Sequence, residues 1–248
     1  MLGIIGGSGL SRLPALDVRR RETLATPYGA PSAALTVGAI AGREVVFLAR
    51  HGDGHTVPPH AVNYRANIWA LHASGVRDVV SVAAVGGIRS DLEPGTLTVP
   101  DQLIDYTHDR ESTFFSGADG VVTHIDFTRP YCETLRKAIL DAGREAGEPL
   151  TDGGTYAVTQ GPRLETAAEI ARLERDGADM VGMTAMPEAA LAREIGLCYA
   201  AIAVVVNPAA GRPGSERAVS LHEMTAVLEA ALIRVQRLLE TLVRRYGD

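Results

Sequence analysis

Cysteine and aromatic residues are scarce in this sequence. Its 248 residues include two cysteines and one tryptophan, and phenylalanine, tyrosine and tryptophan together make up 5%. The two thiols, Cys132 and Cys198, stand far apart and no CxxC motif occurs, so we expect no disulfide framework and a reducing, cytoplasmic environment. The few aromatic residues form no cluster on which the bases of a single-stranded nucleic acid would stack.

Long apolar runs and an excess of positive charge are also missing. The best apolar run, residues 199–206, falls well short of the roughly 20 residues that a transmembrane helix needs. The N-terminus lacks the basic and apolar regions of a signal peptide, so we expect a soluble protein without a membrane partner. The formal net charge of −6 makes a nucleic-acid-binding surface unexpected, because such surfaces are positively charged. Any anion site must therefore be local.

The sequence does contain a regular alternation of strand-like and helix-like segments. Apolar residues make up 46%, enough for a full core. Several apolar runs are continuous, which is typical of strands covered on both faces. The expected strands are residues 2–5, 34–37, 45–49, 79–85, 97–99, 156–159, 180–183 and 200–206. The expected helices are residues 61–74, 131–146, 167–175, 188–194 and 221–246. We therefore predict one α/β domain over residues 1–248, with a central parallel or mixed sheet flanked by helices.

The first expected strand runs into a glycine-rich turn, Gly6-Gly7-Ser8-Gly9. Backbone N–H groups and the Ser8 hydroxyl in such a turn can bind an anion. A dinucleotide fingerprint would need glycine where Arg12 stands, and a hydrolase nucleophile elbow would need glycine at Leu10. The Gly-Lys-Ser/Thr of a P-loop is absent. Taken alone, the turn is equally typical of a plain tight turn.

Arg50 and His51 close another expected strand and enter a glycine-containing loop. Arginine is a permanently charged, planar donor suited to phosphate oxygens. The histidines at 51, 55 and 60 are loosely spaced like zinc ligands, but no helix holds His51 and His55 on one face and Arg50 would repel a cation. We therefore expect no metal site.

Further chemically suggestive residues lie near the ends of other expected strands or after them. They are Ala83 and Ala84 with their backbone amides, Glu165 near a helix start, Met183 and Thr184, and Asn207. Each has an ordinary explanation when taken singly: a strand end, a helix-dipole partner, a core methionine or an Asn-Pro turn.

The order and spacing of these segments are more specific than any one of them. The set comprises residues 6–10, Thr26-Pro27-Tyr28-Gly29, Arg50-His51-Gly52, residues 62–67, Gly161-Pro162-Arg163 and residues 183–188. It resembles the purine nucleoside phosphorylase and methylthioadenosine phosphorylase family over nearly the whole chain. The resemblance implies reversible phosphorolysis, in which inorganic phosphate attacks the anomeric carbon of a nucleoside while the purine leaves. It implies phosphate as a co-substrate and no other cofactor.

The resemblance also assigns residues to the two substrates. The residues that match the family's phosphate site are Ser8, Arg50, His51, Ala83, Ala84 and Thr184. Ser8 keeps the hydroxyl of the more usual threonine, whereas Ala83 replaces a threonine and retains only a backbone donor. Met183 matches the residue under the ribose. Family members are trimers whose sites are closed by a neighbouring subunit, and residues 123–127, with His124, resemble that wall. We expect a homotrimer and leave open whether two trimers pair.

The base is expected to be selected at positions 165, 207 and 209. Methylthioadenosine phosphorylases carry Asp at the positions of Asn207 and Ala209. An Asn amide can read either adenine or a 6-oxopurine, so it leaves the base open. An ionised Glu165 only accepts hydrogen bonds, which suits the N1–H of hypoxanthine or guanine and opposes the N1 acceptor of adenine. We therefore expect a 6-oxopurine, with Asn207, Glu165 and His51 as the catalytic residues.

The group at the sugar's 5′ position depends on the start of the last helix. Leu221 facing the site would favour a methylthio group, and His222 would favour a hydroxyl; only one of the two can face it. The family register favours Leu221. The combination resembles family members that cleave S-methyl-5′-thioinosine to hypoxanthine and 5-methylthioribose 1-phosphate. Cleavage of inosine or guanosine, cleavage of methylthioadenosine, and an inactive nucleoside-binding module are the alternatives.

Overall fold

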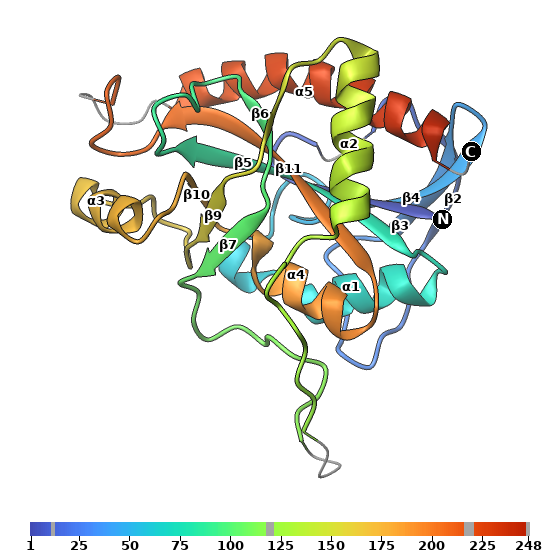
Figure 1. Cartoon of the computed structure of the whole chain (residues 1–248). Coiled ribbons are helices and arrows are strands. Elements are labelled where there is room, and N and C mark those ends of the chain that lie inside the picture. Colours follow the sequence, from blue (N-terminus) through green and yellow to red (C-terminus); the bar gives the residue numbers. More distant parts are fainter. Residues whose placement is uncertain (11–12, 118–121, 216–220, 247–248) are drawn as a thin grey trace.

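The computed structural model describes residues 1–10, 13–117, 122–215 and 221–246. In this part of the chain eleven strands form one mixed sheet with helices on both of its faces (Figure 1). The strands are β1 (Leu2–Gly6), β2 (Asp17–Glu22), β3 (Leu35–Ile40), β4 (Arg43–Ala49), β5 (Asp78–Gly87), β6 (Leu97–Val99), β7 (Gln102–Asp105), β8 (Leu150–Asp152), β9 (Thr155–Val158), β10 (Met180–Gly182) and β11 (Cys198–Pro208). The expectation of an α/β fold with a mixed sheet is confirmed.

The helices match the predicted positions closely. They are α1 (Tyr64–Ala73), α2 (Glu133–Ala146), α3 (Ala167–Arg175), α4 (Ala185–Glu194) and α5 (Leu221–Arg245), with a short 3-10 turn, η1, at Pro59–Ala61. α4 begins three residues before its predicted start, because its first turn includes Pro187 and a non-helical Met186. Among the described residues, no helix combines the length and apolarity needed to cross a bilayer.

A parallel group of four strands forms the middle of the sheet. The order is β4, β1, β5 and β11, and each neighbouring pair is parallel. β1 is buried throughout, and β11 is buried from its second to its ninth residue, which explains their continuous apolar sequences. Parallel strands end at the same sheet edge, and ligands in α/β proteins bind at that edge. The residues that follow β1 and β4, and those at the end of β11, are therefore brought together.

Each face of the sheet has its own core. One core packs residues of α2 and α5, such as Ile139 and Leu238, against one face. The other packs residues of α1 and α4, such as Ile68 and Leu191, against the opposite face. Figure 1 shows this arrangement, with α2 and α5 on one side of the strands and α1 and α4 on the other. The two covered faces hold the central strands in fixed positions beneath the site.

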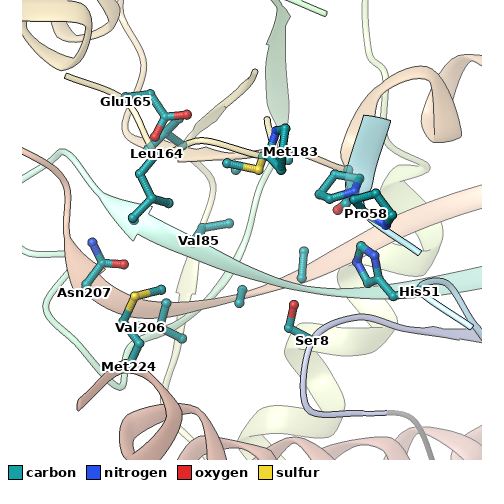
Figure 2. A pocket seen from close by; sticks show the side chains of 18 of the residues that line it. Ser8, His51, Pro58, Val85, Leu164, Glu165, Met183, Val206, Asn207 and Met224 are labelled. Carbon is teal, nitrogen blue, oxygen red and sulfur yellow. The ribbon is translucent and has the colours of Figure 1, made fainter. Parts of the chain in front are cut away.

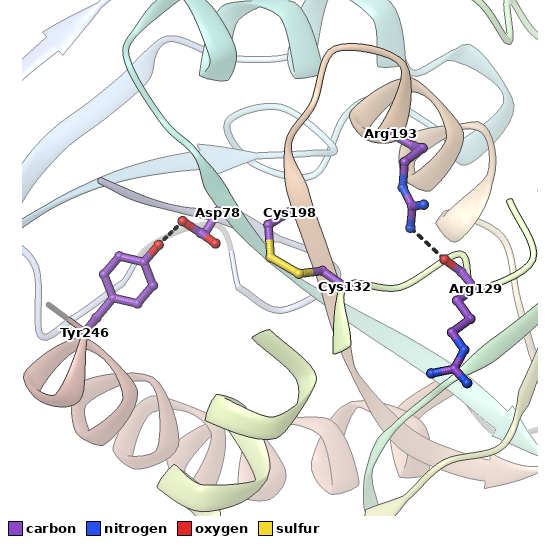
Figure 3. The surroundings of a disulfide bond; sticks show 6 residues. All are labelled: Asp78, Arg129, Cys132, Arg193, Cys198 and Tyr246. Carbon is purple, nitrogen blue, oxygen red and sulfur yellow. Dashed lines mark hydrogen bonds between the residues drawn. A yellow bond between two sulfur atoms is a disulfide. The ribbon is translucent and has the colours of Figure 1, made fainter. Parts of the chain in front are cut away.

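The expectation that the two cysteines stay unpaired is wrong. Cys132 and Cys198 form a disulfide, with their Cα atoms 5.2 Å apart and a separation of 66 positions in sequence (Figure 3). The topology brings them together, because Cys132 precedes α2, Cys198 begins β11, and the Cys132 N–H donates to the Tyr199 carbonyl at 2.8 Å. The number of residues between the two thiols gave no indication of this proximity.

Candidate active site

A pocket of about 500 Å³ opens at the carboxyl edge of the parallel strands. Ten of the twelve residues that the sequence singled out line it: Ser8, Arg50, His51, Ala83, Ala84, Glu165, Met183, Thr184, Asn207 and Ala209. Figure 2 shows Ser8, His51 and Pro58 at one end and Glu165 and Asn207 at the other, with Met183 between them. The volume is that of a small-molecule site.

The glycine-rich turn brings the chain close to Arg50. A side chain at Gly7 would lie 2.4 Å from the Val82 carbonyl oxygen and 3.0 Å from Arg50 Nη1, so only glycine fits there. Gly9 has a φ of +75°, in the left-handed region that favours glycine. The Arg50 N–H donates to the Gly6 carbonyl at 3.0 Å. The turn therefore brings Gly7 close to the arginine and places the next residue, Ser8, at the pocket.

Arg50 is fully buried and held by three partners. Its Nε and Nη2 donate to the Glu188 carboxylate at 2.7 and 2.9 Å, Nη2 also donates to the Ser81 hydroxyl at 2.5 Å, and Nη1 donates to the Val82 carbonyl at 3.1 Å. Burial opposes the charge, but the Glu188 carboxylate outweighs it and keeps the pKa of Arg50 above its ordinary value. The guanidinium is therefore a fixed cation at the wall of the pocket.

His51 is neutral at physiological pH. Burial, reinforced by the charge of Arg50, lowers the pKa of its ring from 6.5 to about 4. Nδ1 lies 2.8 Å from the Val57 carbonyl oxygen, an acceptor, so Nδ1 carries the proton and Nε2 is the bare acceptor. His55 packs against it, with ring centroids 4.6 Å apart. Within the described part of the chain, no three His, Cys, Asp or Glu side chains gather in a metal-binding arrangement.

Glu165 is fixed at the opposite end of the pocket. Its Oε1 accepts a hydrogen bond from the Thr159 hydroxyl at 2.6 Å. The next residue, Thr166, caps α3 in a capping box with Glu169, which fixes the backbone just after Glu165. The second carboxylate oxygen can accept a further hydrogen bond.

Asn207 lies near the end of β11, where the register of β11 against β5 shifts by one residue. Its Nδ2 donates to the Pro208 carbonyl at 2.7 Å, and Figure 2 shows the amide directed into the pocket. The amide retains a second N–H and a carbonyl oxygen, so it can both donate to a ligand and accept from it. Ala209 lies beside it and is buried.

The two remaining sequence candidates are not placed in the pocket. His124 is exposed, on the stretch between β7 and α2 that extends away from the body of the molecule (Figure 1). The side chain of Leu221 lies outside the described residues, and His222 is exposed and does not line the pocket. Met224, one helical turn after Leu221, does line it. Its thioether lies beside Val206 below Asn207 (Figure 2).

The sequence interpretation overlooked several pocket residues. They are His55, Thr56, Val57, Pro58, Pro59, Leu164, Val206 and Met224, among others. Met224 could have been found, because residues three apart share a helix face. The loop at 55–59 carries few functional side-chain groups, so only the fold reveals that it forms a wall.

Known proteins resemble this chain in both sequence and structure. The model of the family described as "Phosphorylase superfamily" matches residues 1–244. A probable S-methyl-5′-thioinosine phosphorylase of Pseudomonas syringae pv. tomato is 53% identical over 94% of this chain and 94% of its own. A 6-oxopurine nucleoside phosphorylase of Pyrococcus furiosus is 48% identical over 87% of this chain and 82% of its own. The structure of methylthioadenosine phosphorylase from Schistosoma mansoni in complex with adenine superposes with a TM-score of 0.94 at 33% identity, covering 99% of this chain and 91% of the other.

Proposed function

Because the chain belongs to the phosphorylase superfamily, we propose that it cleaves the glycosidic bond of S-methyl-5′-thioinosine with inorganic phosphate, giving hypoxanthine and 5-methylthioribose 1-phosphate. One observation carries the proposal. A single pocket holds anion-binding groups, Arg50 and Ser8, at one end and purine-reading groups, Glu165 and Asn207, at the other.

The phosphate end supplies a fixed cation and neutral hydrogen-bonding groups. Arg50 provides the charge, the hydroxyls of Ser8 and Thr184 and the backbone at Ala83 and Ala84 provide further groups, and His51 provides a neutral acceptor for a P–OH group. Groups held in this way position the phosphate for attack on the anomeric carbon without reorganising during the reaction. Met183, between the two ends, is assigned to the ribose.

The purine end favours a 6-oxopurine. Glu165 accepts the N1–H of hypoxanthine, while Asn207 meets N7 with either of its two amide functions, so it can follow N7 from unprotonated to protonated as the base leaves. The relatives named for 6-oxopurine and methylthioinosine cleavage agree with this assignment, since both names denote a 6-oxopurine.

The 5′ group is assigned to an apolar part of the pocket. Met224 lines the pocket beside Val206 (Figure 2), whereas His222 is exposed and does not line it. A thioether against apolar side chains favours a methylthio group over a hydroxyl, because a buried hydroxyl would lack a partner there. Inosine cleavage is therefore the weaker alternative.

We also propose a homotrimer in which a neighbouring subunit's residues 123–127 close the pocket. The exposed His124 and the extension of this stretch away from the body support it, as does Val122, which is 75% exposed. Light scattering of the purified protein tests the assembly.

We also propose a cytoplasmic location. Because Cys132 and Cys198 form a disulfide, the small number of cysteines no longer supports this location.

A release assay tests the activity itself. The purified protein is incubated with S-methyl-5′-thioinosine, with and without phosphate, and free hypoxanthine is measured. The proposal predicts release only with phosphate. Release that does not depend on phosphate would indicate a hydrolase, and no release would favour a binding module.

A further inference from the structure

Arg110 makes several hydrogen bonds to segments around the pocket, although no function has been assigned to it so far. It lies between β7 and α2, it is half-buried, and it does not line the pocket. Its guanidinium lies near acceptors on three different segments: residues 159–160, residues 183–186 and Tyr64. Among the described residues no carboxylate forms an ion pair with it, so the acceptors are carbonyls, an amide oxygen and a hydroxyl.

The first of these segments leads to the purine end of the pocket. Arg110 Nη2 donates to the carbonyls of Gln160 at 2.8 Å and Thr159 at 3.3 Å, and Nε donates to Gln160 Oε1 at 3.1 Å. Thr159 in turn holds Glu165 through its hydroxyl. A single residue, Thr159, therefore connects Arg110 to the carboxylate assigned to the base.

The second segment carries the residues assigned to ribose and phosphate. Arg110 Nη1 donates to the carbonyls of Met183 at 2.9 Å and Met186 at 2.6 Å, which lie on either side of Thr184. This wall packs tightly on the first, since a side chain at Gly161 would lie 2.4 Å from Met183 Sδ. Arg110 thus fixes both walls where they touch.

Tyr64 extends the same set of contacts to a third wall. Its hydroxyl lies 3.3 Å from Arg110 Nη1 and donates to the Pro59 carbonyl at 3.0 Å, and the guanidinium lies over its ring at 5.4 Å from the centroid. Pro59 belongs to the pocket-lining loop that also includes Val57, the partner of His51. Three of the segments that line the pocket are therefore connected through one guanidinium.

We propose that Arg110 is a positioning residue that holds the purine-reading wall and the phosphate-binding wall at the separation needed for phosphorolysis. The inference rests on the proposed function. A guanidinium has five N–H donors in a rigid plane, whereas a lysine ammonium has three on a flexible stem, so lysine cannot replace it. Misplacement of catalytic groups by about 1 Å can cost about 100-fold in rate.

The test compares R110A and R110K with R136A. Arg136 is a matched control, because it also donates to two backbone carbonyls, those of Val99 and Pro100, but lies outside the pocket. Each variant is assayed well below its own unfolding midpoint, and R110A is also assayed with added guanidinium or methylammonium. We expect kcat/KM to fall about 100-fold in R110A and R110K, guanidinium but not methylammonium to restore R110A about ten-fold or more, and R136A to stay near the wild type.

Full activity in folded R110A, full activity in R110K, or no restoration by guanidinium would overturn the inference. Calorimetric binding of inorganic phosphate gives a readout that is independent of turnover. If the wild type cleaves no nucleoside, the proposed function fails, and the inference stands only if R110A binds phosphate more weakly than R136A does. Equal phosphate binding by the two variants would then overturn it as well.

Discussion

The Arg50 guanidinium and the Glu188 carboxylate form a two-point ion pair, with both side chains at 0% exposure. They come from opposite halves of the sequence, 138 residues apart. The pair places a cation at the proposed phosphate site, and the Glu188 carboxylate compensates its charge within the core. Tyr199 donates a further hydrogen bond to Glu188 at 2.7 Å.

Breaking this pair should affect stability and phosphate binding separately. Arg50→Ala and Glu188→Ala each leave one buried charge without its partner, so we expect each to lower the free energy of unfolding by about 3–5 kcal/mol. Replacing both, in R50M/E188L, should recover much of that stability, because apolar side chains of similar size fill the space. Phosphate binding should not recover. A double variant with the wild-type KM for phosphate would place the phosphate site elsewhere.

Substitution of Asn207 by aspartate should change the choice of base. Methylthioadenosine phosphorylases carry aspartate at this position, where it suits a 6-aminopurine. Asn207→Asp should therefore raise the ratio of kcat/KM for methylthioadenosine to kcat/KM for methylthioinosine by about ten-fold or more. The measurement is that ratio in both proteins. Asn207→Ala is the control, since it removes the amide without adding a carboxylate. An unchanged ratio in Asn207→Asp would refute the proposed readout.

The buried, neutral state of His51 should make stability fall in acid. Its pKa is about 4 in the folded protein against 6.5 for an unperturbed histidine, so between these values the unfolded chain binds a proton that the folded chain excludes. The free energy of unfolding should therefore fall as pH drops from about 6.5 towards 4, by at most about 1.4 kcal/mol per pH unit from this residue. Denaturant unfolding of the wild type and His51→Asn at pH 6.5 and 5 measures it. Equal pH dependence in the two proteins would show that His51 is not the group responsible.

The disulfide should stabilise the fold without taking part in the reaction. It closes a segment of 66 residues, for which the chain-entropy estimate is about 4 kcal/mol. We expect C132S/C198S, or the wild type in reductant, to unfold at a lower temperature, with kcat kept at temperatures where the variant remains folded. Thermal melts with and without reductant measure this. Identical midpoints would show that the cross-link contributes nothing to stability.

Much of the fold could be predicted because its central strands carry unbroken apolar runs. All eight expected strands exist, from β1 to β11, within a few residues of their predicted ends. The strands that were not predicted are β2, β7 and β8, which are short or exposed, and β2 reads Asp-Val-Arg-Arg-Arg-Glu. Such edge strands are held by pairing to a neighbour, which leaves no apolar pattern to recognise.

The lining of the pocket was predictable where its residues follow expected strand ends, as Arg50 and Asn207 do. What sequence could not show are relationships between distant segments. Arg110 looks like an ordinary solvated charge in a polar stretch, and Glu188 like a helix-dipole partner. The contacts of both depend on the tertiary arrangement, as does the proximity of Cys132 to Cys198.

One pocket is proposed to select a 6-oxopurine nucleoside that bears a 5′-methylthio group. The most direct measurement is kcat/KM for methylthioinosine, methylthioadenosine and inosine in one assay at saturating phosphate. The Glu165 carboxylate and the apolar Met224 predict the highest value for methylthioinosine. A higher value for methylthioadenosine would contradict the role of Glu165 and Asn207, and a higher value for inosine would contradict the assignment of the 5′ group.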